Sequence, residues 1–158
     1  MVGICLTRKV ALRAAMVLGV HKNSVFSVLR RLTRLGLGGK MGDGRQFVSW
    51  IHETDFCRAV KWLITHDFLS GPVNICAPNP VPNSELMKTF REVFGRSLGL
   101  PAAGWMLELG ALTLRTETEL ILKSRRVIPA RLIESGFIFL FPLLRQALDE
   151  LQTRPRTE

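Results

Sequence analysis

The stretch LGLGGKMGDGRQFVSWIHETD, residues 35–55, indicates how this chain folds. Its closely spaced glycines predict a connecting turn, because glycine adopts backbone conformations that other residues avoid. Residues 46–51 then predict a strand, since they follow that turn and are rich in aromatic and β-branched residues. Residues 53–65 repeat apolar side chains at helical spacing. The stretch is therefore a strand that leads directly into a helix.

The residues before this stretch predict a further strand and helix. Residues 10–18 alternate apolar and other side chains, which is the period of a half-buried strand. Residues 24–35 predict a helix that Asn23 or Ser24 would cap. One face of this helix carries its apolar side chains, which are Val25, Val28, Leu29 and Leu32.

The residues after it continue the alternation of strands and helices. Asn83 is predicted to cap one of these helices. In chain order we expect a strand at 73–76, a helix at 84–94, two helices within 101–124, a short helix at 130–135, an extended segment at 136–139 and a last helix from 142 to 151. This order predicts an α/β or α+β fold with only three or four short strands, few for a doubly wound sheet.

Length and composition exclude several classes of protein. The 158 residues, 47% apolar and 22% charged, fit one globular domain or half of a larger one and argue against disorder. The uncharged apolar runs, such as residues 136–144 with Pro142 inside, are far shorter than the roughly 18 residues that a membrane-spanning helix needs. We therefore expect no membrane partner.

The charge of the chain is unevenly distributed. The formal net charge is +9, and residues 1–42 contain eight Lys and Arg but no acidic residue. This segment would suit a nucleic-acid-binding arm, a mitochondrial targeting sequence or a piece of a domain whose acidic residues lie elsewhere. Nucleic acid is the less favoured partner, because Phe26 is the only aromatic residue before Phe47 and no binding motif is present.

The cysteines predict neither disulfides nor a metal site. They are odd in number and form no C-x-x-C pair, which favours a reducing compartment, the cytoplasm, with the mitochondrion as the alternative. Cys57 follows His52 by five residues, but we expect it to be buried and not to act as a nucleophile. The three cysteines are Cys5, Cys57 and Cys76.

Residues 35–55, with RAAMVLG (13–19), GPVNICAPNPVP (71–82) and VIPARLIESGFIFLFP (127–142), carry a family resemblance. They resemble the C-terminal half of epimerase-family proteins among the atypical short-chain dehydrogenases/reductases, the group with a C-terminal domain of unknown function. The resemblance implies an α/β fold: the C-terminal, substrate-side portion of an NAD(P)-binding Rossmann-type extended short-chain dehydrogenase, with the N-terminal nucleotide-binding half absent.

The resemblance also implies a division of the chain. Residues 1–9 would be a divergent N-terminal stub, and residues 10–70 a remnant of the Rossmann-type half. Residues 71–151 would form the C-terminal substrate-side domain, followed by a tail at 152–158.

The chemistry of the family needs parts that these 158 residues do not contain. The resemblance implies NADP as cofactor, but no spaced glycines follow a strand and open a helix, and the glycines at 36–44 precede a strand. The Tyr-x-x-x-Lys site of the superfamily is excluded because the chain has no tyrosine. We expect no catalytic residue, weak NADP binding and no hydride transfer by this chain alone, as for a truncated oxidoreductase-like protein.

The resemblance places two groups of residues near ligands. Leu18, Gly19 and Val20 would lie at the nicotinamide end of the cofactor. Arg45 and Gln46 would lie at the mouth of a pocket for an unknown small-molecule substrate.

Two further residues are candidate substrate contacts. Trp50 would stack on a substrate ring, although an aromatic residue on a short strand commonly lies in the core. The resemblance places Arg131 near the pocket of related nucleotide-sugar enzymes, where an arginine can hold a diphosphate by bidentate hydrogen bonds. His52 and Asp55 are instead expected to be structural, at the point where a strand enters a helix.

Alternative functions follow from the same residues. The strand at 10–18 would present an exposed sheet edge, through which the chain would pair with a separate nucleotide-binding half or with a second copy of itself. The chain would then be a non-catalytic interaction module. A basic nucleic-acid-binding protein is the third possibility, and a steep salt dependence of DNA binding would reveal it.

Overall fold

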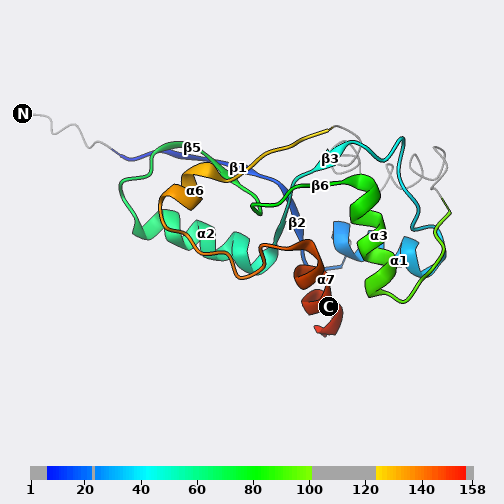
Figure 1. The fold of residues 1–158 in the computed structure, drawn as a ribbon. Helices are drawn as coiled ribbons and strands as arrows, with labels where there is room; N and C mark the ends of the chain where they lie inside the picture. The colour runs from blue at the N-terminus through cyan, green and yellow to red at the C-terminus, as the bar shows by residue number, and fades with distance from the viewer. Residues whose placement is uncertain (1–6, 23, 101–123, 156–158) are drawn as a thin grey trace, which may run out of the picture.

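The computed structural model describes residues 7–22, 24–100 and 124–155 and shows an elongated α/β molecule (Figure 1). In chain order the elements are β1 (Val10–Ala14), β2 (Met16–Leu18), α1 (Val25–Arg34), β3 (Phe47–Val48), β4 (Trp50–His52), α2 (Glu53–Thr65), β5 (Gly71–Ile75), β6 (Val81–Pro82), α3 (Asn83–Val93), α6 (Ala130–Glu134) and α7 (Leu144–Thr153). The α/β prediction is confirmed. The helices predicted within 101–124 lie, except for residue 124, outside the described residues.

The strands form three pairs. β1 pairs in parallel with β5, β2 in parallel with β4, and β3 antiparallel with β6. The strand predicted at 10–18 changes partner at its centre: Ala15 N–H donates to the Ile75 carbonyl (3.0 Å), and Met16 N–H donates to the Ser49 carbonyl (3.2 Å). The prediction of one continuous strand was therefore wrong, because its two neighbours diverge at this point.

The strand predicted at 46–51 is divided in the same way. β3 and β4 lie on either side of Ser49 and pair with different partners, β6 and β2. β5 begins earlier than expected and includes Gly71 and Pro72. β5 can contain Pro72, although proline has no backbone N–H. At its position opposite Ala11, no N–H has to be donated to β1.

Helix starts confirm one capping prediction and contradict another. The Ser24 hydroxyl accepts a hydrogen bond from Ser27 N–H (3.1 Å) and caps α1. The buried face of α1 is turned from the expected one, since Phe26 and Thr33 are buried while Val28 and Leu32 are only partly so. Asn83 is the first residue of α3 and not its cap, because its side-chain oxygen instead accepts from Met41 N–H (2.8 Å).

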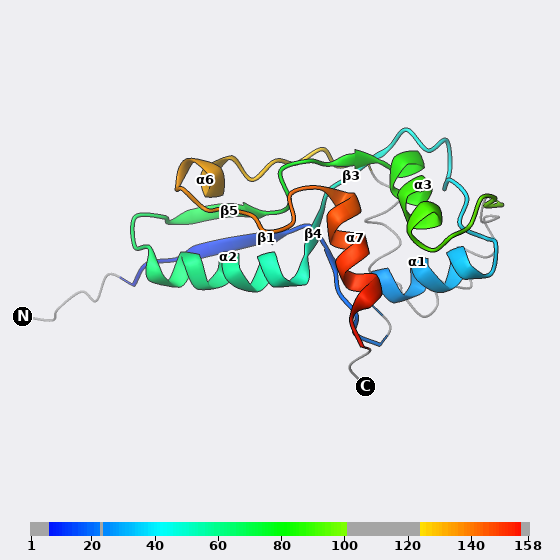
Figure 2. The same ribbon diagram turned by 60° about the horizontal axis from the view of Figure 1, so that its bottom comes forward.

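Apolar side chains form two cores. One lies among β2, α1, α3 and α7, and includes Leu18, Phe26, Trp50, Phe90 and Leu148. The other lies among α2, β5 and α6, and includes Ile51, Leu63, Val73, Ile75 and Leu132. Figure 2 shows α2 along one face of the β1–β5 pair and α6 on the other.

The end of β4 joins the C-terminal helix to α2. The fully buried His52 caps α2, since its Nδ1 accepts from Thr54 N–H (3.1 Å), and its Nε2 lies 2.8 Å from Glu150 Oε2. A second contact joins the same two elements, because the Arg154 guanidinium donates to the Glu53 carboxylate (2.7 Å). α7 thus extends to Thr153, beyond the predicted boundary of the tail. The expected structural role of His52 is confirmed.

Asp55 is a second buried anchor in the first turn of α2. Its carboxylate is 1% exposed and accepts the N–H groups of Leu140 (3.0 Å) and Phe141 (2.8 Å) and the guanidinium of Arg58 (2.8 Å). These bonds fix residues 136–141, where the predicted extended segment 136–139 forms neither helix nor strand.

Among the described helices, none is both long and apolar enough to cross a membrane.

Candidate functional site

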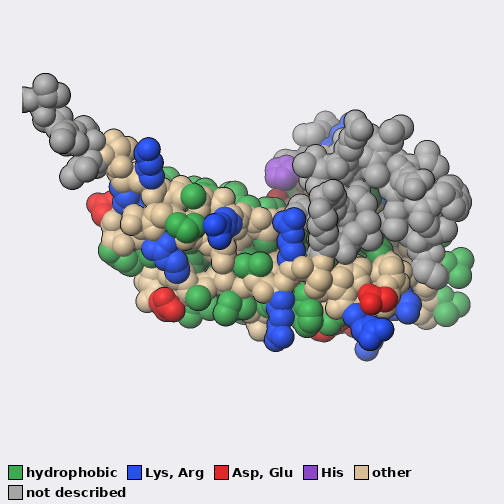
Figure 3. Space-filling view, turned by 90° about the horizontal axis from the view of Figure 1, so that it is seen from above, with side chains coloured by type: hydrophobic (Ala, Val, Ile, Leu, Met, Phe, Trp, Pro, Cys, Tyr) green, Lys and Arg blue, Asp and Glu red, His purple; other side chains and the backbone are tan. Residues whose placement is uncertain are grey.

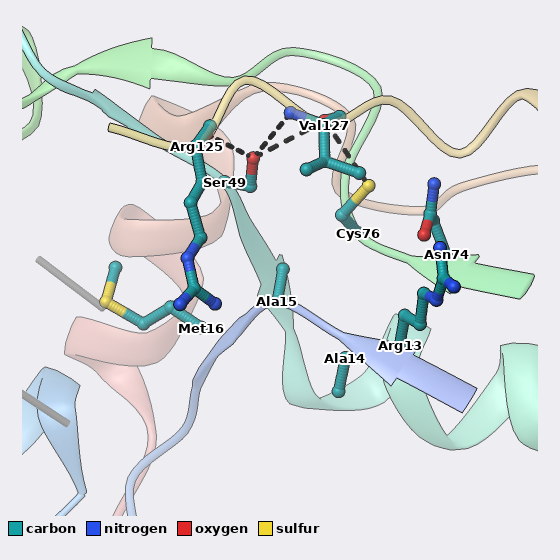
Figure 4. A pocket seen from close by; sticks show the side chains of 9 residues that line it. All are labelled: Arg13, Ala14, Ala15, Met16, Ser49, Asn74, Cys76, Arg125 and Val127. Carbon is teal, nitrogen blue, oxygen red and sulfur yellow. Dashed lines mark hydrogen bonds between the residues drawn. The ribbon is translucent and has the colours of Figure 1, made fainter. Parts of the chain in front are cut away.

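A cleft of about 460 Å³ opens where β4 and β5 diverge (Figure 4). It lies at the carboxyl end of β1, which is the edge of a parallel sheet where ligands of α/β proteins bind. Small side chains leave room here, because Ala14 and Ala15 form part of the wall. The described residues of its lining are Arg13, Ala14, Ala15, Met16, Ser49, Asn74, Cys76, Arg125 and Val127.

Two arginines face the cleft from different parts of the chain. Arg13 lies beside Asn74, its partner in the β1–β5 ladder, and Arg125 extends toward Met16 on the other side (Figure 4). Among the described residues, neither guanidinium has a hydrogen-bond or ion-pair partner. Among the described residues that line the cleft none is acidic and two are arginines, so these residues give it a positive charge.

The segment that carries Arg125 is held over β4 by Ser49. The Ser49 hydroxyl donates to the Arg125 carbonyl (2.7 Å) and accepts from Val127 N–H (2.9 Å). The thiol of Cys76 contributes a weaker contact to the Val127 carbonyl (3.5 Å), and burial raises the pKa of this thiol to about 12. Ser49 therefore positions the wall of the cleft, and Cys76 is a neutral part of its floor.

The residues predicted at the nicotinamide end of the cofactor do not line this cleft. Leu18, Gly19 and Val20 are buried. A Cβ atom at Gly19 would lie 2.1 Å from Glu53 Oε2, so a larger residue here would require the Glu53 side chain to move. The residues of this segment that line the cleft are those at positions 13–16.

The predicted substrate contacts are dispersed. Arg45 is 89% exposed and lies 3.5 Å from Asp43, and Gln46 donates to the Met41 carbonyl (2.8 Å). Trp50 has no exposed surface and donates its indole N–H to the Asn79 carbonyl (3.0 Å), so its ring belongs to the core.

Arg131 also makes a backbone contact, donating to the Pro72 carbonyl (2.7 Å). None of these four substrate candidates lines the cleft.

The residues that line the cleft were not among those predicted from the sequence. A signal was available for Arg13 and Asn74: both are polar residues within otherwise apolar strands, and parallel neighbours in register bring them side by side. Arg125 had no such signal, because the bond from Ser49 that places it joins residues 76 positions apart.

The two cysteines that the structure describes differ in exposure. Cys57 is exposed, so the prediction that it is buried was wrong; the outer face of α2 carries it. Cys76 is buried. Within the described ranges, no group of three or more His, Cys, Asp or Glu side chains could hold a metal ion.

The glycine-rich turn does not fit a dinucleotide pyrophosphate. Gly36, Gly42 and Gly44 adopt positive φ, but the Gly44 N–H already donates to the Met41 carbonyl (3.2 Å). The Gly39 N–H donates to the Leu100 carbonyl (3.0 Å). A phosphate cradle needs such amides free and pointing into one space. These glycines instead form the connection between α1 and β3.

The fold is that of NAD(P)-binding epimerases and short-chain dehydrogenases with a Rossmann-like architecture. One solved relative is a nucleoside-diphosphate sugar epimerase from Corynebacterium glutamicum. Its TM-score is 0.68 at 28% identity, and the match covers 91% of this chain and 26% of that one. The match concerns fold and arrangement, and the activity in its name is that of the relative.

Sequence relatives identify the family. An epimerase family protein of Mycobacterium leprae is 37% identical over 154 residues, which are 94% of this chain and 48% of the relative. The human epimerase family protein SDR39U1, crystallised with NADPH, gives a TM-score of 0.81 at 30% identity and matches 94% of this chain and 50% of its own. A domain of unknown function, DUF1731, matches residues 102–151.

This chain belongs to the epimerase family of short-chain dehydrogenase/reductase-like proteins, which confirms the resemblance seen in the sequence. It spans about half the length of the curated relatives it matches.

Proposed function

We propose that this chain forms the C-terminal, substrate-side half of an NADP(H)-dependent epimerase-like oxidoreductase. In this proposal its cleft binds the substrate, while a nucleotide-binding half supplies the cofactor site and the proton-transferring group. The observation that carries the proposal is the cleft at the carboxyl end of β1, directly beside an edge of β1 that has no partner strand among the described residues. A second half that continued the sheet from β1 would bring its own ligand edge to this cleft.

The exposure of β1 supports this arrangement. Four of its five residues are exposed, including Leu12, whose side chain is 45% exposed. An inner strand of a doubly wound sheet is normally covered on both faces and paired on both edges. β1 has the apolar sequence of such a strand but only one neighbour, β5, in the described part of the chain.

The chain's own residues would bind and orient the substrate. Arg13 and Arg125 would attract a negatively charged group, and the Asn74 amide would supply both a donor and an acceptor. We assign no hydride-transfer step to the described residues, because they lack a cradle that fits the dinucleotide. The human relative crystallised with NADPH supports this cofactor for the complete protein.

A joined protein tests the proposal. The half of the Mycobacterium leprae relative that this chain does not match would be fused to the chain, and NADPH binding would be followed by nicotinamide fluorescence. We expect the joined protein to bind NADPH at least ~100-fold more tightly than the chain alone, a difference of about 2.7 kcal/mol.

Two controls accompany this experiment. The unmatched half alone should bind NADPH more weakly than the joined protein if the chain completes the fold. NADH in place of NADPH tests the preference for the phosphorylated cofactor. Equal NADPH affinity of the chain alone and the joined protein would contradict the proposal. A joined protein that is soluble but binds no NADPH would also contradict it.

The exposed edge of β1 also favours a second candidate function, a non-catalytic interaction module. In that case a strand of another chain would pair with β1 through backbone hydrogen bonds. The two candidates differ in ligand binding, because an interaction module would give no NADPH affinity in the joined protein.

A further inference from the structure

We propose that the cleft between Arg13 and Arg125 binds an oxyanion, a phosphate or carboxylate group, carried by the substrate. This inference rests on the proposed function and names its substrate class: a small molecule with an acidic group. The basis is the placement of two guanidinium groups on opposite sides of one cleft, with no acidic residue among the described residues of its lining.

The charge arrangement is the first argument. Elsewhere in the described structure, arginines that approach the core meet carboxylates or carbonyls, as Arg58 meets Asp55 (2.8 Å) and Arg154 meets Glu53 (2.7 Å). Arg13 and Arg125 meet neither among the described residues. Two cations that share one cleft repel each other, and an anion between them removes this repulsion and gains charge-assisted hydrogen bonds.

Both arginines are fixed at their base, which is the second argument. Arg13 lies within the β1–β5 ladder, opposite Asn74. The backbone of Arg125 is held twice, because its carbonyl accepts from Ser49 Oγ (2.7 Å) and its N–H donates to the Phe47 carbonyl (2.9 Å). A site whose donors are held in place before binding loses less conformational entropy when the ligand arrives.

The remainder of the lining explains why the anion would be one end of a larger molecule. Ala14, Ala15, Met16 and Val127 are uncharged and largely apolar, and the Cys76 thiol is kept neutral by its burial. A free inorganic ion would need only the arginines. A cleft of about 460 Å³ with this lining has room for a small organic body beside its acidic group.

The wider surface does not account for the pair of arginines. Basic side chains are spread along the face seen in Figure 3, and acidic side chains lie mainly toward its ends. Arg126 provides the contrast, since its guanidinium carbon lies 4.9 Å from the centre of the Phe47 ring and it does not line the cleft. A variant of Arg126 therefore serves as the control for a general attraction of anions to a chain of net charge +9.

The test is a titration of the full chain with inorganic phosphate and, separately, with acetate at constant ionic strength. The chain would carry ¹⁵N-labelled arginine, so that each side-chain Nε–H signal is followed by NMR. We expect the Arg13 and Arg125 signals to shift together and to saturate. The variants Arg13→Gln and Arg125→Gln should each weaken the binding by roughly tenfold, whereas Arg126→Gln should leave it unchanged.

Three results would overturn the proposal. The first is a linear shift that never saturates, and the second is an equal loss of affinity in Arg126→Gln, which would mean attraction to net charge only. Because Arg125 is exposed and its side chain forms no hydrogen bond or ion pair with a described residue, Arg125→Gln should fold normally even if Arg13→Gln does not. An unchanged affinity in a folded Arg125→Gln variant is the third.

The joined protein separates a substrate oxyanion from a cofactor phosphate. If the cleft belongs to the substrate, saturating NADPH leaves the affinity for phosphate unchanged. Competition between NADPH and phosphate would assign the cleft to the cofactor and overturn the substrate assignment. Saturable binding by the chain that depends on both arginines supports the oxyanion site even if the joined protein binds no NADPH, a result that would overturn the proposed function alone.

Discussion

β1 and β2 are consecutive pieces of one alternating apolar stretch, yet their surroundings differ completely. In β2, Met16 and Leu18 are buried at 3% and 0% exposure against α1, α3 and α7. In β1, four of five residues are exposed, including Leu12 at 45%. The partner change at Ala15 separates the two environments.

The difference shows what an apolar alternation reports. It describes the ability of a strand to be buried on one face, and the burial itself depends on elements that lie far away in the sequence or in another part of the protein. β2 receives its cover from helices of this chain. β1 has a partner strand along one edge only within the described residues, and four of its five residues are exposed.

The largest expected difference between a buried and an exposed side chain is the difference in thiol reactivity between Cys76, which follows β5, and Cys57 on α2. Burial raises the pKa of the Cys76 thiol to about 12, so at pH 8 only about one molecule in ten thousand carries the reactive thiolate. Cys57 lies exposed on α2. In a Cys5→Ser background, Ellman's reagent should modify Cys57 at least ~1,000-fold faster than Cys76. Equal rates in the folded protein would mean that the end of β5 is open to solvent.

The second prediction compares two leucines of the same stretch. Leu18→Ala should lower the free energy of unfolding by about 2–5 kcal/mol, because it leaves a cavity in a filled core. Leu12→Ala should cost about 1 kcal/mol or less, since this side chain is already partly exposed. Urea unfolding of the two variants measures both values. Similar losses would show that β1 is as well covered as β2 in solution.

The third prediction concerns pH and the end of β4. Burial lowers the pKa of His52 from 6.5, and this effect exceeds the opposing influence of Glu150. At His52 the folded protein therefore binds fewer protons than the unfolded chain. The contribution of this residue to the free energy of unfolding is fully present above pH 6.5 and is lost as the pH falls below that value. Protonation would also place a hydrogen on Nδ1 and break the bond from Thr54 N–H.

Urea unfolding between pH 7.5 and 5.5 measures this dependence. His52→Asn, which keeps a side-chain acceptor at the helix start, should reduce the slope of stability against pH. His66→Gln is the matched control, because His66 contacts neither Thr54 nor Glu150 in the described structure. An unaltered slope in His52→Asn would refute the assignment of the pH dependence to this residue.

The smallest expected effect concerns self-association through β1. An exposed apolar edge strand pairs readily with another chain, and a lysine on such a strand opposes this. Leu12→Lys should therefore raise the dissociation constant of self-association by about tenfold, or about 1.4 kcal/mol. Sedimentation velocity over a range of concentrations measures it, with Ile64→Lys on the outer face of α2 as the control. A wild-type chain that stays monomeric throughout would contradict the account of β1 as an open edge.

The sequence was sufficient for most helices and for the family. The helical spacing in residues 53–65 predicted α2 with its bounds, because a buried face with period 3.6 is a local signal. Ser24 was recognisable as a cap for a similar reason. Strand ends were less predictable, since the division at Ser49 depends on two partner strands and not on the local residues.

The site depended still more on distant contacts. Arg45, Gln46, Trp50 and Arg131 were selected by resemblance to complete proteins, and each makes its described contacts within this chain. The cleft is instead formed by residues whose roles depend on strand register and on the position of residues 124–127. Neither property has a local pattern.

The carboxylate of Asp55 has a consequence for how this chain reaches its folded state. It receives backbone hydrogen bonds from residues 85 and 86 positions downstream, so α2 acquires its anchor only after a very long loop has closed. Closing such a loop carries an entropic cost, and contacts of this sequence separation slow folding. Until then the carboxylate must remain hydrated at the start of a preformed helix. The closure of residues 136–141 onto α2 is therefore expected to be among the last and slowest events in folding, detectable by refolding kinetics of Asp55→Asn.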